Sequence, residues 1–490
     1  MKHFAYILSL VIISSGLVFS QAQTRVDQCV SCHNDLETPE AKLFQHDIHR
    51  MKGLSCADCH GGNRYAEDMD QAMDKKAGYI GVPKGDQISS MCAKCHGDAE
   101  KMKQYHSSLP TNQFENLKES VHGRLDLTGN ARIAQCSTCH NAHGIVSVKN
   151  PASPVYPLNI PATCAKCHAN PTYMRTYDPS LPVDQLEKYR TSIHGIRNKK
   201  GDPKPAECAS CHGSHDIKSV HDAKSSVYPL NIPATCAHCH SDAAYMKQYG
   251  IPTDQFEKYS LSVHGVALLK KHDISAPACN SCHGNHGAVP PGVESISKVC
   301  GTCHALNADL FSSSPHKKAF DERKLPECET CHSNHEILTP TEKMLGTTAD
   351  AVCSRCHTEK ENPKGFIAAQ QMRTLMDSLI HEEAKAKMLV NEAEQRGMEV
   401  SDAEYKLRDA HQALLQSRTA VHAFNEEKFA ETVKPGLATA ALVEGEAKGA
   451  VEEYYFRRMG LGVATLIITI LAVSLFLYIR RLEKNGKHKV

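Results

Sequence analysis

The pentapeptide C-x-x-C-H occurs eleven times in this chain of 490 residues and uses all 22 of its cysteines. In such a motif the two thiols form thioethers with one haem, and the histidine binds the haem iron. A cysteine pair alone could also be half of a zinc site or a redox disulfide, but neither requires a histidine after every pair. The motifs therefore predict eleven covalently bound haem c groups.

The predicted ligands follow directly from the motifs. The predicted thioether cysteines are Cys29 with Cys32, Cys56 with Cys59, Cys92 with Cys95, Cys136 with Cys139, Cys164 with Cys167, Cys208 with Cys211, Cys236 with Cys239, Cys279 with Cys282, Cys300 with Cys303, Cys328 with Cys331 and Cys353 with Cys356. The predicted proximal iron ligands are His33, His60, His96, His140, His168, His212, His240, His283, His304, His332 and His357.

The composition leaves few large apolar side chains to build a core. The chain has no Trp and only 6% aromatic residues, and its 56 Lys and Arg balance 55 Asp and Glu, which excludes the basic footprint of a nucleic-acid-binding protein. The motifs crowd into residues 29–357, so we expect porphyrins to supply much of the core. Gly, Pro and Ser between the motifs favour loops and short helices over sheet, which predicts a mainly α and irregular fold.

Tandem repeats organise the motifs. The motifs at Cys92, Cys164 and Cys236 begin 72 residues apart. Each repeat contains a first motif, a Ser-[Val/Ile]-His-Gly segment, a second motif, and a trailing histidine three residues beyond the second proximal histidine. We place these two-haem repeats near residues 88–150, 151–224 and 225–296, within a haem domain that covers residues 23–363.

A second set of histidines recurs in the repeats, and we predict that they are distal iron ligands, because two axial histidines saturate a haem iron. The shorter units on either side supply equivalents, although Asn63 replaces the trailing histidine of the first. The repeat-matched candidates are His49, His122, His143, His194, His215, His264, His286, His316 and His335. Further candidates from the C-terminal helices are His381, His411 and His422. Met102, Met174 and Met246 are alternative ligands, but with enough histidines present we expect them to pack against porphyrin.

Apolar runs mark both ends of the chain. Residues 1–22 are typical of a signal peptide, the alternative being an uncleaved N-terminal anchor. Residues 460–479 carry no charge and would span about 30 Å as a helix, which predicts a transmembrane helix rather than a buried core helix. The basic tail, residues 480–490, then predicts a cytoplasmic C-terminus and a periplasmic haem region anchored in the bacterial inner membrane.

The segment between haem domain and membrane, residues 364–456, is rich in Ala, Glu, Lys, Leu and Gln and predicts long helices. The first should run from Phe366 to Arg396. A second should open at a capping box formed by Ser401 and Glu404, and a third should begin near Pro435. A structural bundle is the preferred interpretation, and a separate partner-binding module is the alternative.

Over roughly residues 29–357 the chain resembles the multihaem c-type cytochromes of bacterial respiratory chains. The resemblance rests on the paired motifs, the Ser-Val-His-Gly segments and the extended motifs at residues 208–215 and 279–286. The long C-terminal helices are similar to those of the octahaem hydroxylamine oxidoreductase and multihaem nitrite reductase group. The C-x-x-C-K motif that marks the pentahaem nitrite reductase active site is absent from the sequence. The resemblance implies a periplasmic electron carrier with a quinol-oxidising membrane partner.

Two functions from different classes fit these features. In the first, the chain passes electrons between a quinol-linked inner-membrane oxidoreductase and other periplasmic or outer-membrane cytochromes, and it needs no substrate-converting residue. In the second, one haem with an open face reduces or oxidises nitrite, hydroxylamine, tetrathionate or a similar compound. The missing trailing histidine at Asn63 and the likeness of the C-terminal helices support the second. Direct quinol oxidation by the single apolar helix is disfavoured, because residues 460–479 contain no ionisable side chain of the Asp, Glu, His, Lys or Arg type.

Overall fold

The computed structural model describes residues 25–105, 107–292 and 296–486, and these residues form helices and loops without a β-strand. One isolated antiparallel bridge, between Leu125 and Arg132, is the nearest approach to sheet in the described part. The predicted mainly α and irregular fold is therefore confirmed. The predicted signal peptide, residues 1–22, and residues 487–490 of the tail lie outside the described residues.

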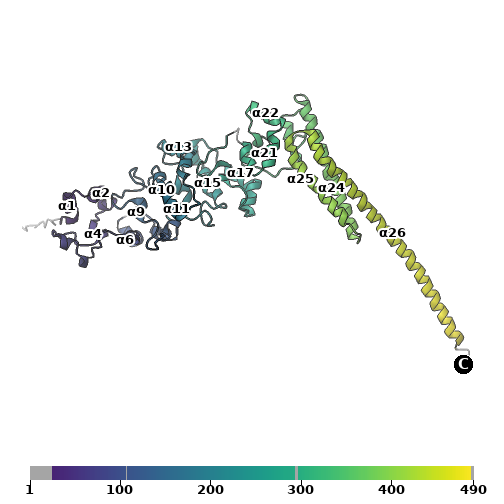
Figure 1. Ribbon diagram of the computed structural model, residues 1–490, viewed down its shortest axis with the longest axis horizontal. Helices are drawn as coiled ribbons and strands as arrows, with labels where there is room; N and C mark the ends of the chain where they lie inside the picture. The colour runs from purple at the N-terminus through teal and green to yellow at the C-terminus, as the bar shows by residue number, and fades with distance from the viewer. Residues whose placement is uncertain (1–24, 106, 293–295, 487–490) are drawn as a thin grey trace, which may run out of the picture. The chain divides into compact units, whose positions relative to one another are not determined.

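The chain divides into two compact units, residues 1–228 and residues 229–490, each considered by itself. Figure 1 labels the helices of both. The helices of the first unit are α1 (Gln28–Asp35), α2 (Pro39–Phe44), α3 (Ile48–Met51), α4 (Cys56–His60), α5 (Met69–Ala72), η1 (Lys75–Ala77), α6 (Asp86–His96), α7 (Ala99–Gln104), α8 (Gln113–Glu119), η2 (Val121–Gly123), α9 (Cys136–His140), α10 (Ile160–His168), α11 (Pro171–Tyr177), α12 (Gln185–Thr191), α13 (Ile193–Lys199) and α14 (Cys208–His212).

The second unit continues the short helices and ends in three long ones. Its helices are α15 (Ile232–His240), α16 (Ala243–Met246), η3 (Lys247–Tyr249), α17 (Gln255–Leu261), α18 (Val263–Gly265), η4 (Val266–Lys270), α19 (Cys279–His283), α20 (Ile296–Gly301), α21 (Ala305–Ser312), α22 (Pro315–Arg323), α23 (Glu327–His332), η6 (Glu342–Met344), η7 (Cys353–Arg355), α24 (Pro363–Gln395), α25 (Ser401–Ala420), η8 (Val421–Ala423) and α26 (Glu426–Gly486).

The motif-bearing region buries few large apolar side chains. Its buried hydrophobic residues include Met102, Met174 and Met246, one after each first motif of a repeat, whereas Leu36 and Val82 are 73% and 79% exposed. A polypeptide core of this size would not hold so many short helices together by apolar burial alone. The sparse core agrees with a fold in which bound porphyrins complete the packing.

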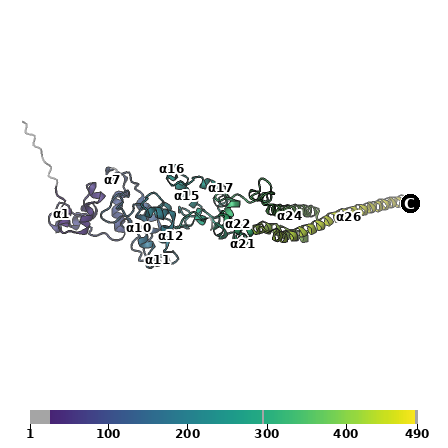
Figure 2. The same ribbon diagram turned by 90° about the horizontal axis from the view of Figure 1, so that it is seen from above.

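The three long helices form a bundle with an ordinary side-chain core. In both views α24 and α26 lie side by side (Figures 1 and 2), and Leu379, Phe429 and Val433 are fully buried between them. Helix α24 ends where the sequence predicts, because Gly397 adopts a positive φ of 75° that ends the helical path. It begins slightly earlier than predicted, where Asn362 caps its first turn.

One predicted helix cap and one predicted helix start are wrong. Helix α25 begins at Ser401 as predicted, but the capping box of Ser401 and Glu404 does not form, because the N–H of Ser401 donates to the carboxylate of Glu399 instead. Helix α26 begins at Glu426, not near Pro435, and Pro435 lies inside it. The proline ring has no N–H, so the carbonyl of Glu431 loses its usual helical donor without ending the helix.

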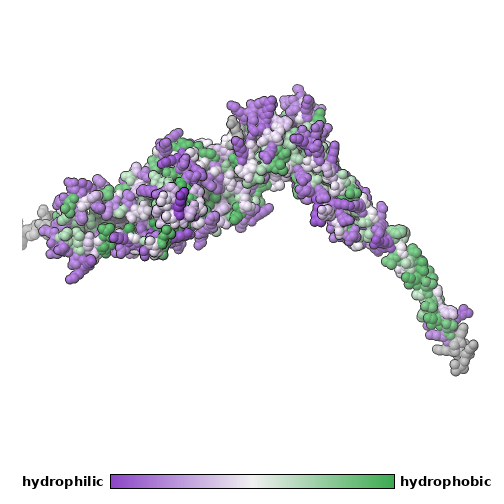
Figure 3. Space-filling view, viewed as in Figure 1, coloured by the Kyte–Doolittle hydropathy of each residue, from purple (hydrophilic) through white to green (hydrophobic). Residues whose placement is uncertain are grey.

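The last part of α26 is a candidate membrane span. The helix is long and apolar enough to cross a bilayer, and the apolar window is not buried against any described part of the protein. Figure 3 shows this stretch as an apolar segment beyond the hydrophilic surface of the bundle. Side chains along it, such as Leu466 and Phe476, are more than half exposed, as a lipid-facing helix requires.

A glycine contact in the bundle provides a test of its packing. A Cβ added at Gly436 would lie 2.5 Å from the Cβ of Ala413, whereas one added at Gly445 on the same helix would meet nothing within 4 Å. Overpacking costs roughly 1–3 kcal/mol, and replacing a helical glycine by alanine gains about 1 kcal/mol. We expect Gly436→Ala to lower, and Gly445→Ala to raise, the midpoint of thermal helix loss followed by circular dichroism. Equal shifts in both variants would contradict the close packing at Gly436.

Candidate haem sites

Each motif folds into a helical turn that places its three ligands on one side. Second motifs form short helices, as in α9 and α14, and the first motifs of the repeats end longer helices, as in α10. The Cys29 motif instead begins α1, and the Cys300 and Cys353 motifs run past the ends of α20 and η7. Residues three and four apart share one face of a helix, so both thiols and the imidazole point to the same side. This is the arrangement that two vinyl groups and an iron on one porphyrin require.

Local capping starts the second-motif helices. At α4 the Ser55 hydroxyl accepts from the N–H of Ala57, and the Asp58 carboxylate accepts from the N–H of Ser55. Glu207 with Ser210 plays the same part at α14. The helix then ends directly after the proximal histidine.

The residue after each second-motif histidine has a positive φ. These residues are Gly61, Asn141, Gly213, Gly284 and Ser333, with φ between 67° and 85°. A left-handed residue reverses the chain at the helix end. The reversal carries the next residues, including the trailing histidine, away from the haem site that the motif itself forms.

The Ser-[Val/Ile]-His-Gly segments are built around a capped turn. The Ser192 hydroxyl accepts from the N–H of Gly195 at 2.9 Å and donates to the carbonyl of Tyr189 at 2.6 Å. A Cβ at Gly195 would lie 1.9 Å from that carbonyl oxygen, so glycine is required. Ser120 with Gly123 and Ser262 with Gly265 make the same contacts. The histidine between serine and glycine is thereby held in a fixed direction.

Backbone hydrogen bonds join this turn to the following repeat. The N–H of Val121 donates to the carbonyl of Ile217 at 2.8 Å, and Val263 donates in the same way to Ile337. Ile217 and Ile337 each lie two residues after a trailing histidine, His215 or His335. The two kinds of predicted distal histidine are therefore placed together by one contact between neighbouring repeats.

Eight pairs of histidine rings face each other within the two units. Every pair joins one proximal and one predicted distal histidine, with ring centres 5.6 to 6.3 Å apart. The first-motif pairs are His96 with His49, His168 with His122, His304 with His264 and His357 with His316. The second-motif pairs are His60 with His143, His140 with His215, His283 with His335 and His332 with His422.

The pairing crosses from repeat to repeat. A first-motif histidine faces the Ser-x-His-Gly histidine of the preceding repeat, and a second-motif histidine faces the trailing histidine of the following repeat. The sequence does not reveal this exchange. Within one repeat, each predicted distal histidine lies next to a motif whose proximal histidine it does not face. At the C-terminal end, His422 of η8 takes the place of a trailing histidine.

The gap between the rings fits a haem iron. Two imidazole nitrogens bound on opposite sides of a metal at about 2 Å each would lie roughly 4 Å apart, with ring centres about 6 Å apart. The observed ring separations match this value, although the Nε2 atoms of His316 and His357, 3.4 Å apart, lie closer together than two bound nitrogens would. The described residues contain no cluster of three or more His, Cys, Asp or Glu side chains suited to a metal without a porphyrin.

Hydrogen bonds orient several of these rings with Nε2 toward the gap. Nδ1 of His60 donates to the carbonyl of Gly81 at 2.9 Å, and Nδ1 of His283 donates to the carbonyl of Val289 at 3.1 Å. Nδ1 of His422 donates to the carbonyl of Thr419 at 3.0 Å. Because a carbonyl can only accept, Nδ1 carries the proton and Nε2 keeps the lone pair that binds a metal.

Burial favours the neutral imidazole that metal binding needs. Desolvation, followed by the charge of the facing His357, lowers the pKa of His316 to about 4. Desolvation also lowers the pKa of His122, and the facing His168 adds to the effect. Neutral rings at neutral pH are ready to coordinate without first losing a proton.

His49 differs from its counterparts because it has a buried carboxylate partner. Asp47 is 2% exposed, and its Oδ1 lies 2.8 Å from Nδ1 of His49 while Oδ2 accepts from the N–H of Ile145 at 2.8 Å. Burial raises the pKa of Asp47, but the hydrogen bonds from His49 and Ile145 outweigh it and lower the pKa below its usual value. In the repeats a serine occupies this position, so the carboxylate is particular to one site.

Cysteines of consecutive motifs lie close together. The thiols of Cys92 and Cys136 are within hydrogen-bonding distance, as are those of Cys300 and Cys328. Between repeats the second cysteine of one motif approaches the next motif, as Cys139 approaches Cys164. Successive haem sites are therefore neighbours in space as well as in sequence.

Some predicted residues are not brought to a facing ring. His381 and His411 are exposed on α24 and α25, and Nδ1 of His411 lies 2.7 Å from the carboxylate of Glu383. His33 has no facing histidine within the described residues. His194 on α13 and His212 at the end of α14 lie in the first unit, and His240 at the end of α15 and His286 lie in the second.

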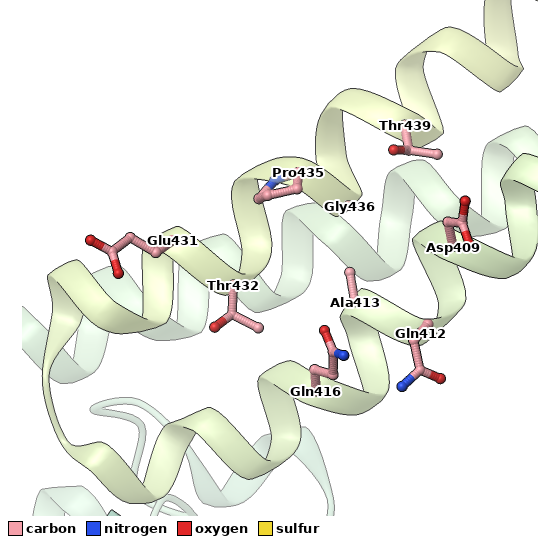
Figure 4. A pocket seen from close by; sticks show the side chains of 9 residues that line it. All are labelled: Asp409, Gln412, Ala413, Gln416, Glu431, Thr432, Pro435, Gly436 and Thr439. Carbon is pink, nitrogen blue, oxygen red and sulfur yellow. The ribbon is translucent and has the colours of Figure 1, made fainter.

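The open groove on the bundle offers no iron ligand. Its lining comes from α25 and α26 around Pro435 and Gly436, and it includes Asp409, Gln416 and Glu431 but no histidine or cysteine (Figure 4). The groove therefore does not belong to the haem sites.

Comparison with known proteins agrees with this geometry. The cytochrome c3 family matches residues 48–169, the doubled CXXCH motif matches residues 318–362, and the cytochrome c554 and c-prime family matches residues 13–61.

A curated relative gives the same indication. The chain is similar to the C-type polyheme cytochrome OmcC of Geobacter sulfurreducens, with 21% identity over 295 residues. The match covers 52% of this chain and 36% of the relative, so the chain spans only about a third of that protein's length. No solved structure matches the chain. The motifs, the family matches and the relative together support a multihaem c-type cytochrome.

Ring orientation predicts two spectroscopic classes of site. The four second-motif pairs are within 19° of parallel, whereas the four first-motif pairs are twisted by 43° to 88°. Parallel imidazoles act on the same iron dπ orbital and split the two dπ levels, while crossed imidazoles leave them nearly equal. We expect the EPR spectrum of the oxidised protein to contain both rhombic and strongly anisotropic low-spin signals in similar amounts. A single class would contradict the alternation.

The carboxylate at His49 predicts a lowered reduction potential at the Cys92 motif. A charged acceptor on Nδ1 makes His49 a stronger donor and stabilises ferric iron. Loss of about 1 kcal/mol of this stabilisation corresponds to roughly 40 mV for one electron, so Asp47→Asn should raise one midpoint potential by some tens of millivolts in a spectropotentiometric titration. Asp98→Asn, which removes a charge near the same motif without touching a histidine, is the control. An equal effect of both variants would mean that charge alone is responsible.

Proposed function

We propose that this multihaem c-type cytochrome binds eleven haem c groups and carries electrons along them between a membrane partner and other cytochromes. The observation that carries the proposal is the facing of proximal and distal histidines, which gives each paired site two axial ligands. The repeat order assigns the same ligand roles to His194 and His286, the equivalents of His122 and His215. Ten sites would then be saturated by histidine.

Saturated sites favour electron transfer over substrate conversion. An iron held by two imidazoles has no free position for a substrate, and its ligands do not change between oxidation states. Here the turn around each Ser-x-His-Gly histidine and the carbonyl bonds to Nδ1 keep the rings fixed. Rigid ligation of this kind limits the rearrangement that accompanies gain or loss of an electron.

The order of the sites supports a continuous path within each unit. Haem bound at the motifs supplies a one-electron iron couple, and the cysteine contacts hold successive couples beside each other. In the second unit these contacts run from Cys236 to Cys279, from Cys282 to Cys300, from Cys300 to Cys328 and from Cys331 to Cys353. No site needs to be skipped along this stretch.

The C-terminal helix supports attachment to a membrane. The apolar stretch of α26 is followed by Arg480, Arg481 and Lys484, and basic residues remain preferentially on the cytoplasmic side. We therefore propose that the haem region is periplasmic and anchored in the inner membrane. A quinol-linked membrane subunit would deliver or receive electrons there, since the span carries no ionisable group for quinol chemistry. Periplasmic or outer-membrane cytochromes would serve the other end of the path.

A reductase of a small nitrogen or sulfur compound is the second candidate function. The ring pairs change which site could be open. A trailing histidine faces the second motif of the preceding repeat, so the asparagine at position 63 does not remove a ligand from either motif of its own unit. The candidate open site is instead the one formed by Cys29, Cys32 and His33, where no facing histidine occurs among the described residues. Turnover of nitrite, hydroxylamine or tetrathionate by the purified protein would favour this second function.

Removal of one distal histidine tests the ligand assignment. In His122→Ala the iron bound by His168 should lose its second ligand, so the oxidised protein should gain one high-spin haem and the reduced protein should bind one more CO per chain than the wild type. His221→Ala, which alters an exposed histidine without a facing ring, should change neither quantity. An unchanged spin state in His122→Ala would refute the cross-repeat ligation.

A further inference from the structure

We propose that the haem held by Cys29, Cys32 and His33 keeps one axial face free of any protein ligand and binds small neutral π-accepting molecules there, of the class of carbon monoxide and nitric oxide. The inference rests on the histidine ligation proposed above and adds a ligand-binding site to an electron-transfer chain. It is carried by the contrast between His33 and the other proximal histidines.

The pairing seen at the other first motifs does not recur at His33 within the described residues. First-motif histidines face a Ser-x-His-Gly histidine, or its equivalent, from the repeat before them, as His168 faces His122. Within the described residues no histidine ring faces His33, and its imidazole contacts Thr38.

The chain provides a substitute at the opposite end of the motif array. His332 has no following repeat with a trailing histidine, yet η8 brings His422 to within 6.1 Å of it, ring centre to ring centre. The half-buried ring of His422 is oriented by Nδ1, which donates to the carbonyl of Thr419 at 3.0 Å. In the first unit, His46 follows α2 but is exposed and makes no contact with His33. The last second motif is thus faced by a histidine from outside the repeats, whereas no such histidine faces His33 within the described residues.

His33 is nevertheless oriented as a proximal ligand. The Thr38 hydroxyl donates to the carbonyl of His33 at 3.2 Å, so its oxygen accepts from Nδ1 of His33, 3.5 Å away. Nε2 then keeps its lone pair for iron. The site lacks only the second ligand, which is the condition under which haem iron binds exogenous molecules.

The surroundings favour neutral ligands over anions. Two cations beside the site are paired, Lys42 with Glu37 and Arg64 with Asp27, and Arg25 lies over the ring of Tyr65. Carbon monoxide and nitric oxide are uncharged, so they need no cation at the iron.

The site is also within reach of electrons from the rest of the chain. The N–H of Gln28 donates to the carbonyl of Arg64 at 2.8 Å. Arg64 in turn bridges Asp27 and Asp58, one beside each motif. The first two motifs are thereby held together, and the ferrous state that binds CO or NO can be populated.

The first experiment counts open sites in the detergent-solubilised holoprotein. EPR of the oxidised protein should show one high-spin haem among eleven, and titration of the reduced protein should take up one CO per chain. His46→Ala should leave both values unchanged, and His49→Ala, which opens the site of His96, should raise the CO count to two.

The outcomes separate the inference from the function on which it rests. If the wild type binds no CO while His49→Ala binds one, the ligation is right and the free face of His33 is refuted. If the wild type binds none and His46→Ala binds one, His46 is the missing ligand. A near-infrared band typical of methionine ligation, in the absence of CO binding, would also overturn the inference. If the wild type binds several CO molecules, the ligation itself fails.

A second experiment assigns the open site to His33. Only a five-coordinate ferrous haem gives a resonance Raman iron–histidine stretching band, and its frequency depends on the hydrogen bond at Nδ1. Thr38→Val removes that acceptor and should shift the band to lower frequency. Thr374→Val, the same substitution on an exposed turn of α24, should not. A band that is present but unmoved by Thr38→Val would place the open site elsewhere and overturn the inference.

Discussion

The facing of histidine rings from two different repeats, which we propose coordinate one iron between them, is the constraint on which the rest of the structure depends. With so few buried apolar side chains in the motif region, neighbouring repeats have little else to hold them in register. The ring pairs link each repeat to both of its neighbours: His168 faces His122 of the repeat before it, and His140 faces His215 of the repeat after it. Each repeat therefore gives a ligand to the one before it and another to the one after it.

The features that carry this exchange are small and local. A positive φ after each second-motif histidine reverses the chain, and a glycine packed on a carbonyl oxygen fixes each Ser-x-His-Gly turn. The hydrogen bond from the N–H of Val121 to the carbonyl of Ile217 then brings a Ser-x-His-Gly turn next to the segment that follows a trailing histidine. Helix propensity contributes little, since most of these helices are only one or two turns long.

The sequence predicts the fold class and α24 well, because motif chemistry and long amphipathic helices are local signals. It identifies His122 and His215 as candidates through recurrence, yet it cannot say which proximal histidine each one faces, since that depends on contacts between repeats. The sequence gives no periodic signal for Asp47, because this carboxylate occurs once where the repeats have a serine. It predicts the start of α26 wrongly, because bundle packing outweighs the local cost of Pro435.

The direction of the exchange has a consequence for how the protein is made. A chain that emerges from its N-terminus presents Cys56, Cys59 and His60 well before His143, which faces His60 in the folded protein. On the ligation proposed above, a haem held by a second motif would gain its second ligand only from the repeat that follows. The same proposal gives the last second motif its ligand from outside the repeats, because His422 on η8 faces His332.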